Sequence, residues 1–90
     1  MNINIWVMWD NENDFIDWKN TTSKCDKIAT VDNGEYKIEY EYCEGIVYVT
    51  ELEFDNYESC YGIVDEYIDS VILQCETLEE TLIWLLKKII

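Results

Sequence analysis

The stretch from Glu35 to Gly45, EYKIEYEYCEG, alternates charged side chains, mostly carboxylates, with tyrosine and isoleucine. Closely spaced carboxylates serve as acid and base in glycoside hydrolysis, as calcium ligands, or as contacts to a basic protein. Hydrolysis needs one pair set apart from the rest, and none is set apart among the 20 Asp and Glu residues. The chain has no histidine for a nucleophilic triad and no glycine-rich phosphate loop. We therefore expect neither an enzyme nor a cofactor.

Metal ligation is not expected either. The run DNEND, residues 10–14, places oxygen donors as an EF-hand loop does, but Phe15 stands where that loop needs glycine and Thr21 where it needs glutamate. Cys25, Cys43, Cys60 and Cys75 lie far apart, without a C-x-x-C pair. An even number of cysteines is compatible with disulfides, but no leader pattern opens the sequence. We expect reduced, unlinked thiols in a cytoplasmic protein.

The elements that carry these residues predict a single α+β domain over residues 1–90. With 49% hydrophobic and 14% aromatic residues, the chain has the composition of a folded protein despite a net charge of −14. Residues 2–9 are typical of a first strand and residues 10–20 of a short helix. We expect an antiparallel sheet of three to five strands packed by two or three helices, with a helical C-terminal part.

The Asn33-Gly34 dipeptide predicts a two-residue hairpin turn. That register pairs Val31 with Tyr36 and Ala29 with Ile38 on an apolar face. It places Glu39 and Glu41 on the other face, with Asp26 opposite Glu41. Apolar and charged side chains thus lie on opposite faces, as an antiparallel sheet with one buried face requires.

A second hairpin is expected at Glu44-Gly45. A two-residue loop would pair Ile38 with Glu51, and a three-residue loop would pair it with Thr50. We favour the three-residue loop because it keeps one face apolar. It places Val47 and Val49 on the outer face beside Glu39 and Glu41.

From Asp55 the spacing of apolar residues predicts a helix that extends to Cys75, although Val71 to Leu73 would also suit a short strand. Thr77 to Glu80 forms a capping box that opens a last helix, with Leu78, Leu82, Leu85 and Ile89 on one face. The final apolar run, LIWLLKKII, is too short to span a bilayer.

The net charge restricts the partners. Nucleic acids and anionic membranes have the same sign as this chain, so we expect it to bind neither directly and to bind a basic protein instead. We expect a monomer or a small homo-oligomer.

In length, acidity and acidic strands within a small α+β fold, the chain resembles phage-type DNA-mimic inhibitors, a class that includes anti-CRISPR proteins and restriction inhibitors. The resemblance covers composition and layout and no residue motif. It implies a phage or mobile-element protein that occupies a nucleic-acid-binding surface of a host defence protein. Two alternatives stay open: an immunity protein that neutralises a basic nuclease toxin, and a non-inhibitory scaffold subunit that oligomerises.

We predict that the partner binds an acidic ridge on the outer face of the sheet, with an apolar centre at Ile28, Val47 and Val49. Its predicted partner-binding residues are Asp26, Glu35, Glu39, Glu41, Val47, Val49, Glu51, Glu53 and Asp55. The alternative is that the last helices cover this face. A secondary candidate surface is the polar side of the helix predicted after Asp55, with Glu58, Asp65, Glu66 and Asp69.

Overall fold

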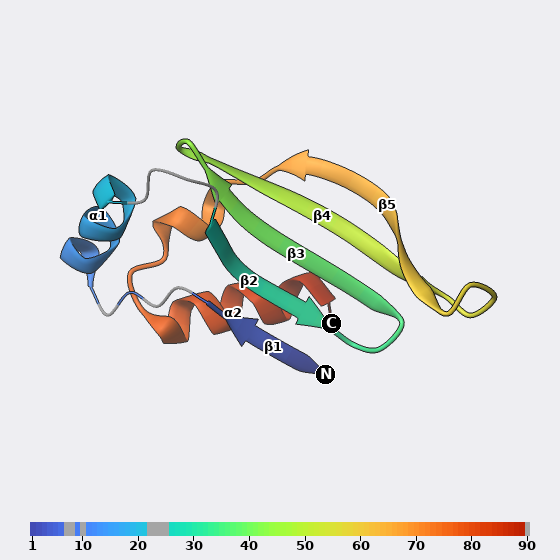
Figure 1. Cartoon of the computed structure of the whole chain (residues 1–90). Coiled ribbons are helices and arrows are strands. Elements are labelled where there is room, and N and C mark those ends of the chain that lie inside the picture. Colours follow the sequence, from blue (N-terminus) through green and yellow to red (C-terminus); the bar gives the residue numbers. More distant parts are fainter. Residues whose placement is uncertain (7–8, 10, 22–25, 90) are drawn as a thin grey trace.

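The structure is a computed structural model, which describes residues 1–6, 9, 11–21 and 26–89. Its elements are β1 (Asn2–Ile5), α1 (Glu12–Thr21), β2 (Asp26–Asp32), β3 (Tyr36–Cys43), β4 (Ile46–Asp55), β5 (Cys60–Ile68), the short 3-10 helix η1 (Val71–Gln74) and α2 (Leu78–Ile89). The strands form one five-stranded antiparallel sheet in chain order. The prediction of an α+β fold with a helical C-terminus is confirmed (Figure 1).

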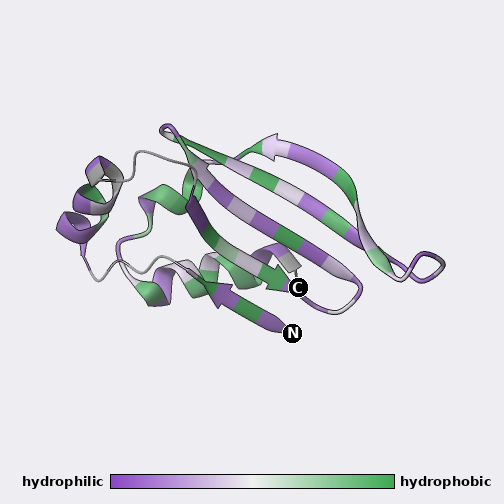
Figure 2. Cartoon of the chain, in the orientation of Figure 1, coloured by the Kyte–Doolittle hydropathy of each residue, from purple (hydrophilic) through white to green (hydrophobic). Residues whose placement is uncertain are grey.

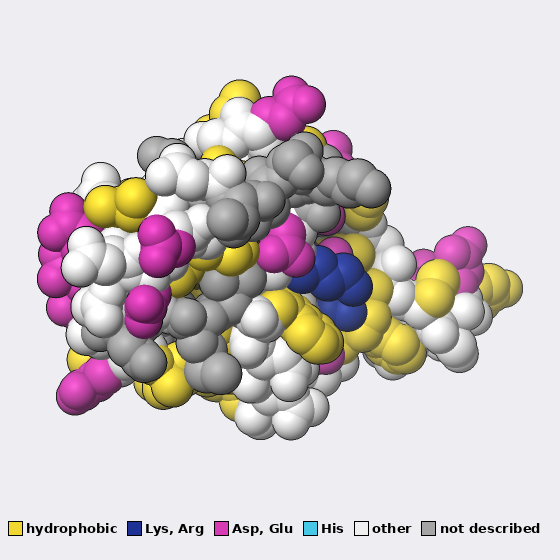
Figure 3. Space-filling model, turned by 60° about the vertical axis from the view of Figure 1, so that its left-hand side comes forward, with side chains coloured by type: hydrophobic (Ala, Val, Ile, Leu, Met, Phe, Trp, Pro, Cys, Tyr) yellow, Lys and Arg dark blue, Asp and Glu magenta, His cyan; other side chains and the backbone are white. Residues whose placement is uncertain are grey.

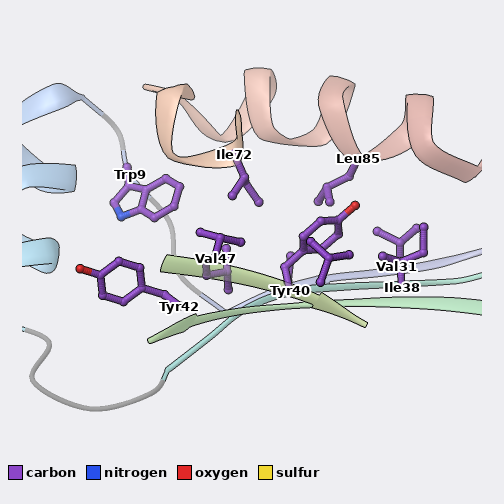
Figure 4. Close-up of a cluster of buried hydrophobic side chains, with 11 residues drawn as sticks. Trp9, Val31, Ile38, Tyr40, Tyr42, Val47, Ile72 and Leu85 are labelled. Carbon is purple, nitrogen blue, oxygen red and sulfur yellow. The ribbon is translucent and has the colours of Figure 1, made fainter. Parts of the chain in front are cut away.

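The helical segments pack on one face of the sheet. Ile72 of η1 and Leu85 of α2 are fully buried and face Tyr40 and Val47 of the sheet (Figure 4). Trp9 adds an aromatic corner, since its ring lies 5.3 Å from those of both Phe15 and Trp18. This core is confined to one face, so the colours in Figure 2 alternate along the strands.

The capping box predicted for the last helix is present in part. Thr77 Oγ1 accepts a hydrogen bond from the Glu80 amide at 3.2 Å, and a Glu80 carboxylate oxygen accepts one from the Glu76 amide at 2.8 Å. In a full capping box the Glu80 carboxylate would accept the bond from the amide of the cap residue, Thr77. Here it accepts the bond from the amide one residue earlier, that of Glu76. Of the predicted apolar face of this helix, Leu85 is buried, whereas Leu78 is 36% exposed.

The first hairpin forms at the predicted place with a different loop. Asn33 pairs with Tyr36, so Gly34, with φ of 94°, occupies the first loop position rather than the second. The register moves by two residues, which leaves each side chain on its predicted face. A bulge between Lys27 and Ala29 then reverses the faces, and Asp26 pairs with Tyr42 instead of Glu41.

The predicted register of the second hairpin is wrong. Cys43 pairs with Ile46 across a two-residue loop in which Glu44 and Gly45 both have positive φ, 51° and 85°. This is the geometry of a type I′ turn, whose twist matches that of the strands. The one-residue shift moves Val47 and Val49 to the helix-covered face, where they are 0% and 1% exposed.

The predicted helix after Asp55 is also wrong, because this segment forms the end of β4, a turn and β5. Asp55 does cap two amides, those of Tyr57 and Glu58, but it does so in a hairpin turn. A side-chain cap satisfies the amides of a turn as well as those of a helix. The aromatic and β-branched residues that follow suit a strand, and the β4–β5 hairpin extends beyond the other strands (Figure 1).

The prediction that all four thiols are unlinked is contradicted at Cys43, which is disulfide-bonded. Cys60 and Cys75 are free, and Cys25 lies outside the described residues. Burial raises the pKa of the Cys75 thiol. Disulfides are rare in a reducing cytoplasm, so the bonded Cys43 does not support the expected cytoplasmic location, which stays a prediction.

Tyr40 gives a first testable prediction about stability. It is 1% exposed, and its hydroxyl has no hydrogen-bond partner in the described part of the chain. Replacing Tyr40 by Phe removes an unsatisfied buried polar group, so the free energy of unfolding should rise by about 1 kcal/mol. Replacing Tyr67 by Phe is the matched control: its hydroxyl donates to Glu51 at 2.7 Å, so that change should lower stability by about 1 kcal/mol. Urea unfolding measures both, and an equal loss in the two variants would contradict the prediction.

Candidate partner-binding surface

Cross-strand pairing arranges the other face of the sheet, here called the open face, in rows. One row runs Lys27, Glu41, Tyr48, Ile68, and the next runs Thr30, Glu39, Thr50, Glu66. A third row contains Asp32, Lys37, Leu52 and Ile63. No described helix packs against these side chains. Within the described residues, the alternative that the last helices cover the predicted face is therefore wrong for Glu39 and Glu41. It is confirmed for the predicted apolar centre, Ile28, Val47 and Val49, which is buried with Ile72 and Leu85 of the helical segments.

The third row is largely neutralised by internal contacts. Lys37 forms a salt bridge with Glu39 at 3.2 Å, and its ammonium lies 5.3 Å from the centre of the Tyr61 ring. The Tyr61 hydroxyl donates to Asp32 at 2.8 Å. The Gly34 amide is the main cause of the lowered pKa of the Asp32 carboxyl, and the bond from Tyr61 adds to it. This end of the open face is therefore satisfied within the chain.

Part of the first two rows lines an open groove, named here the Tyr48 groove. It has a volume of about 740 Å³, and its lining includes Glu41, Cys43, Tyr48, Thr50, Glu66 and Ile68. Tyr48 is 45% exposed and Ile68 62%. Within the described residues, neither Glu41 nor Glu66 forms a salt bridge. The groove thus combines an exposed aromatic ring with two unpaired carboxylates.

Such a groove matches a basic side chain. A guanidinium or ammonium group is attracted to the face of a tyrosine ring and forms charge-assisted hydrogen bonds with carboxylates. Arginine suits it better than lysine because its planar group stacks on a ring while its edge donates to carboxylates. The Tyr48 groove is therefore suited to a protein partner with basic side chains.

Glu51 lies on the helix-covered face and is not among the residues that line the groove. Its carboxylate accepts hydrogen bonds from the hydroxyls of Tyr36 at 2.5 Å and Tyr67 at 2.7 Å. These two bonds, with the Tyr36 bond the larger cause, lower the pKa of the Glu51 carboxyl. The same bond raises the pKa of Tyr36 to about 12, so its hydroxyl remains a donor at neutral pH. Glu51 therefore contributes to folding, not to an exposed ridge.

The structure divides the predicted ridge. Only Glu39 and Glu41 lie on the open face, while Val47, Val49 and Ile28 are buried and Glu53 lies on the helix-covered face near Glu51. Asp26 accepts a hydrogen bond from the Trp18 indole at 3.2 Å. Glu35 and Asp55 lie in or beside the turns at the far end of the sheet. The predicted apolar centre is therefore wrong. The one-residue register shift of β4 buries Val47 and Val49, and Ile28 is buried at the bulge of β2 between Lys27 and Ala29.

The secondary candidates do not share a helix face. Glu58 lies in the β4–β5 turn, and Asp65 and Glu66 are neighbours on β5, where Asp65 pairs with Glu51 and Glu66 with Thr50. Asp69 is bound by Lys88 at 3.3 Å. Only Glu66 joins Glu41 at the Tyr48 groove. Figure 3 likewise shows acidic side chains scattered over one side of the molecule, with a small basic patch among them.

Tyr48, Thr50 and Ile68 were not among the partner-binding residues that the sequence predicted. The usable signal was the alternation Ile46, Tyr48, Thr50, which the two-residue loop places on the same face as Glu41. The partners from β5 had no such signal, because that segment was interpreted as helical.

Among the described residues, no group of acidic, cysteine or histidine side chains is arranged to hold a metal ion. None of the described helices is long and apolar enough to cross a membrane. Comparisons with protein-family models, with curated proteins and with solved structures found no match.

Proposed function

We propose that this protein is an acidic binding protein that inhibits its target by occupying a basic, nucleic-acid-binding surface. The observation that carries the proposal is the Tyr48 groove on the uncovered face, where Glu41 and Glu66 are unpaired within the described part of the chain. A basic surface supplies the cations that these carboxylates and the Tyr48 ring bind.

The overall charge supports the same function. The molecule is 45 Å long, so its net charge of −14 corresponds to about one negative charge per 3 Å, roughly half the density of duplex DNA. A field of this size speeds association with a basic target and opposes association with nucleic acids. The anti-defence role expected from the resemblance is one form of this function. The immunity role is another, and the scaffold role stays a separate prediction.

A competition experiment tests the proposal. The immobilised protein captures its target from a bacterial lysate, and the purified target is then loaded with fluorescent duplex DNA. Adding the protein should displace the DNA with 1:1 stoichiometry, and the displacement should weaken between about 0.05 and 0.5 M salt as the Debye length falls from roughly 14 to 4 Å.

Two results would contradict the proposal. One is direct binding of the isolated protein to duplex or single-stranded DNA at micromolar concentration and 0.15 M salt. The other is a captured protein that releases no DNA, together with a salt-insensitive homodimer in light scattering, which would favour the scaffold role.

A further inference from the structure

Strand β5 forms an edge of the sheet. It pairs with β4 and with no other strand of the described sheet, so the backbone groups on its outer side have no strand partner. It has nine residues, against four in β1 at the opposite edge. Its side chains are largely exposed, including Ile63 at 63%, Val64 at 56% and Ile68 at 62%. A long edge with exposed apolar residues is a template for another strand.

Proteins usually protect such edges with proline, with lysine or with a covering element. β5 contains neither proline nor lysine, and among the described residues no element pairs along its outer side. Its charged residues are Asp65 and Glu66, next to the bulge where pairing with β4 shifts between Glu51 and Leu52. The edge is therefore protected by negative charge, which repels an acidic strand and attracts a basic one.

Charge decides between the possible occupants. A second copy of this chain would bring another body of net charge −14 and would set Asp65 and Glu66 near their own counterparts. An extended basic segment of another protein avoids this repulsion. It can place lysine or arginine opposite Asp65 and Glu66, and apolar residues opposite Ile63 and Ile68, so that opposite charges and apolar groups face each other.

The edge is continuous with the Tyr48 groove. Glu66 and Ile68 belong to both, and Ile68 pairs directly with Tyr48 of β4. Alternate side chains of an added strand would point to the open face, because successive residues of a strand point to opposite faces. A basic side chain opposite Glu66 would thus lie at the entrance of the groove.

We propose that β5 is a docking edge to which an extended basic segment of the partner adds as a sixth strand, with its cationic side chains opposite Asp65 and Glu66. This inference rests on the proposed function, since it assigns the binding mode of the same basic partner. Backbone hydrogen bonds supply affinity in strand addition, and the facing side chains supply specificity.

The test uses the full chain as the receptor and, as the probe, a synthetic nine-residue peptide with two adjacent lysines at its centre and valine or threonine elsewhere, because Asp65 and Glu66 are adjacent and point to opposite faces of the sheet. Hydrogen exchange followed by NMR should show at least 10-fold slower exchange of β5 amides when the peptide is saturating, with no change in β1. Two further peptides have the same sequence and charge but carry N-methyl groups on the odd or on the even residues. Because an added strand bonds through one edge only, one of the two should bind at least 10-fold more weakly than the other.

The outcomes separate this proposal from the proposed function. Equal affinity for all three peptides, or protection at β1 rather than β5, would mean binding by charge alone and would overturn the docking edge, while displacement of DNA from the target would still stand. Concentration-dependent protection of β5 without any peptide would show self-association and would also overturn it. Slower exchange of the β5 amides, together with weaker binding of only one of the two N-methylated peptides, supports the docking edge even if the captured target does not bind DNA.

Discussion

Replacing Glu51 by lysine is expected to lower the free energy of unfolding by about 2 kcal/mol. The carboxylate accepts the hydroxyl hydrogens of Tyr36 and Tyr67, at 2.5 and 2.7 Å, and a lysine leaves both donors without an acceptor. Because the side chain is only partly buried, water recovers part of this loss. A variant in which Glu39, Glu41, Glu51 and Glu53 are all replaced by lysine is for this reason not neutral for folding.

Glu53→Lys is the matched control for Glu51→Lys. It makes the same charge change two residues along the same strand and on the same face, but the side chain is exposed. Its stability should stay within about 0.5 kcal/mol of the wild type. Urea unfolding compares the three proteins, and equal losses in the two variants would show that charge, not the tyrosine bonds, is responsible.

The pH dependence of Glu51 has a definite sign. Its pKa is lowered in the folded state, mainly by the Tyr36 bond, from an ordinary value of 4.5. A group with a lowered pKa contributes stability that is fully present well above its unfolded pKa and is lost as the pH falls through the folded pKa. The stability advantage of the wild type over Glu51→Gln should therefore be constant near neutral pH and shrink below about pH 4.5.

The second large effect is expected in binding. The double variant Glu41→Lys, Glu66→Lys reverses both unpaired carboxylates of the Tyr48 groove, so its affinity for the basic target should fall by about 100-fold, or roughly 3 kcal/mol. Both side chains are exposed on the sheet, so stability should change little. Titration calorimetry with the captured target measures the affinity.

Glu12→Lys, Glu76→Lys is the control for this double variant. It changes the net charge by the same amount, but these residues lie in α1 and just before α2, beside Phe15 and Leu73, away from the groove. A general field effect would weaken both variants alike, chiefly through the association rate. A specific groove predicts a loss for the control of less than about 3-fold at 0.15 M salt, where exposed charges are largely screened. Equal losses would place the contact elsewhere.

The turns and the fold class could be predicted from local sequence. Gly34 and Gly45 both adopt positive φ, which glycine does at little cost, and each is in the loop of a hairpin. Thr77 predicted the start of α2 because its hydroxyl satisfies a free amide at the first turn. These features depend on neighbouring residues only, and the sequence contains all of them.

The register of β4 could not be read from its own residues. Ile46, Val47, Tyr48 and Val49 are apolar at four successive positions, so alternation does not say which pair faces the core. Glu44 decided the loop by adopting positive φ, which is uncommon for a residue other than glycine. Burial of Val47 and Val49 beneath the helical segments then offsets the cost of that turn.

The sequence by itself determined an acidic α+β domain with two hairpins, a capped last helix and 20 carboxylate side chains. Only the tertiary structure decided that the residues after Asp55 form a strand that pairs with β4 and not a helix. Their apolar side chains fit the spacing of a helix as well as a strand, and the hydrogen bonds offered by β4 select the strand. That pairing brings Glu66 and Ile68 beside Glu41 and Tyr48 and leaves β5 at the edge. Contacts between residues far apart in the chain, which no local pattern encodes, therefore formed the candidate surface.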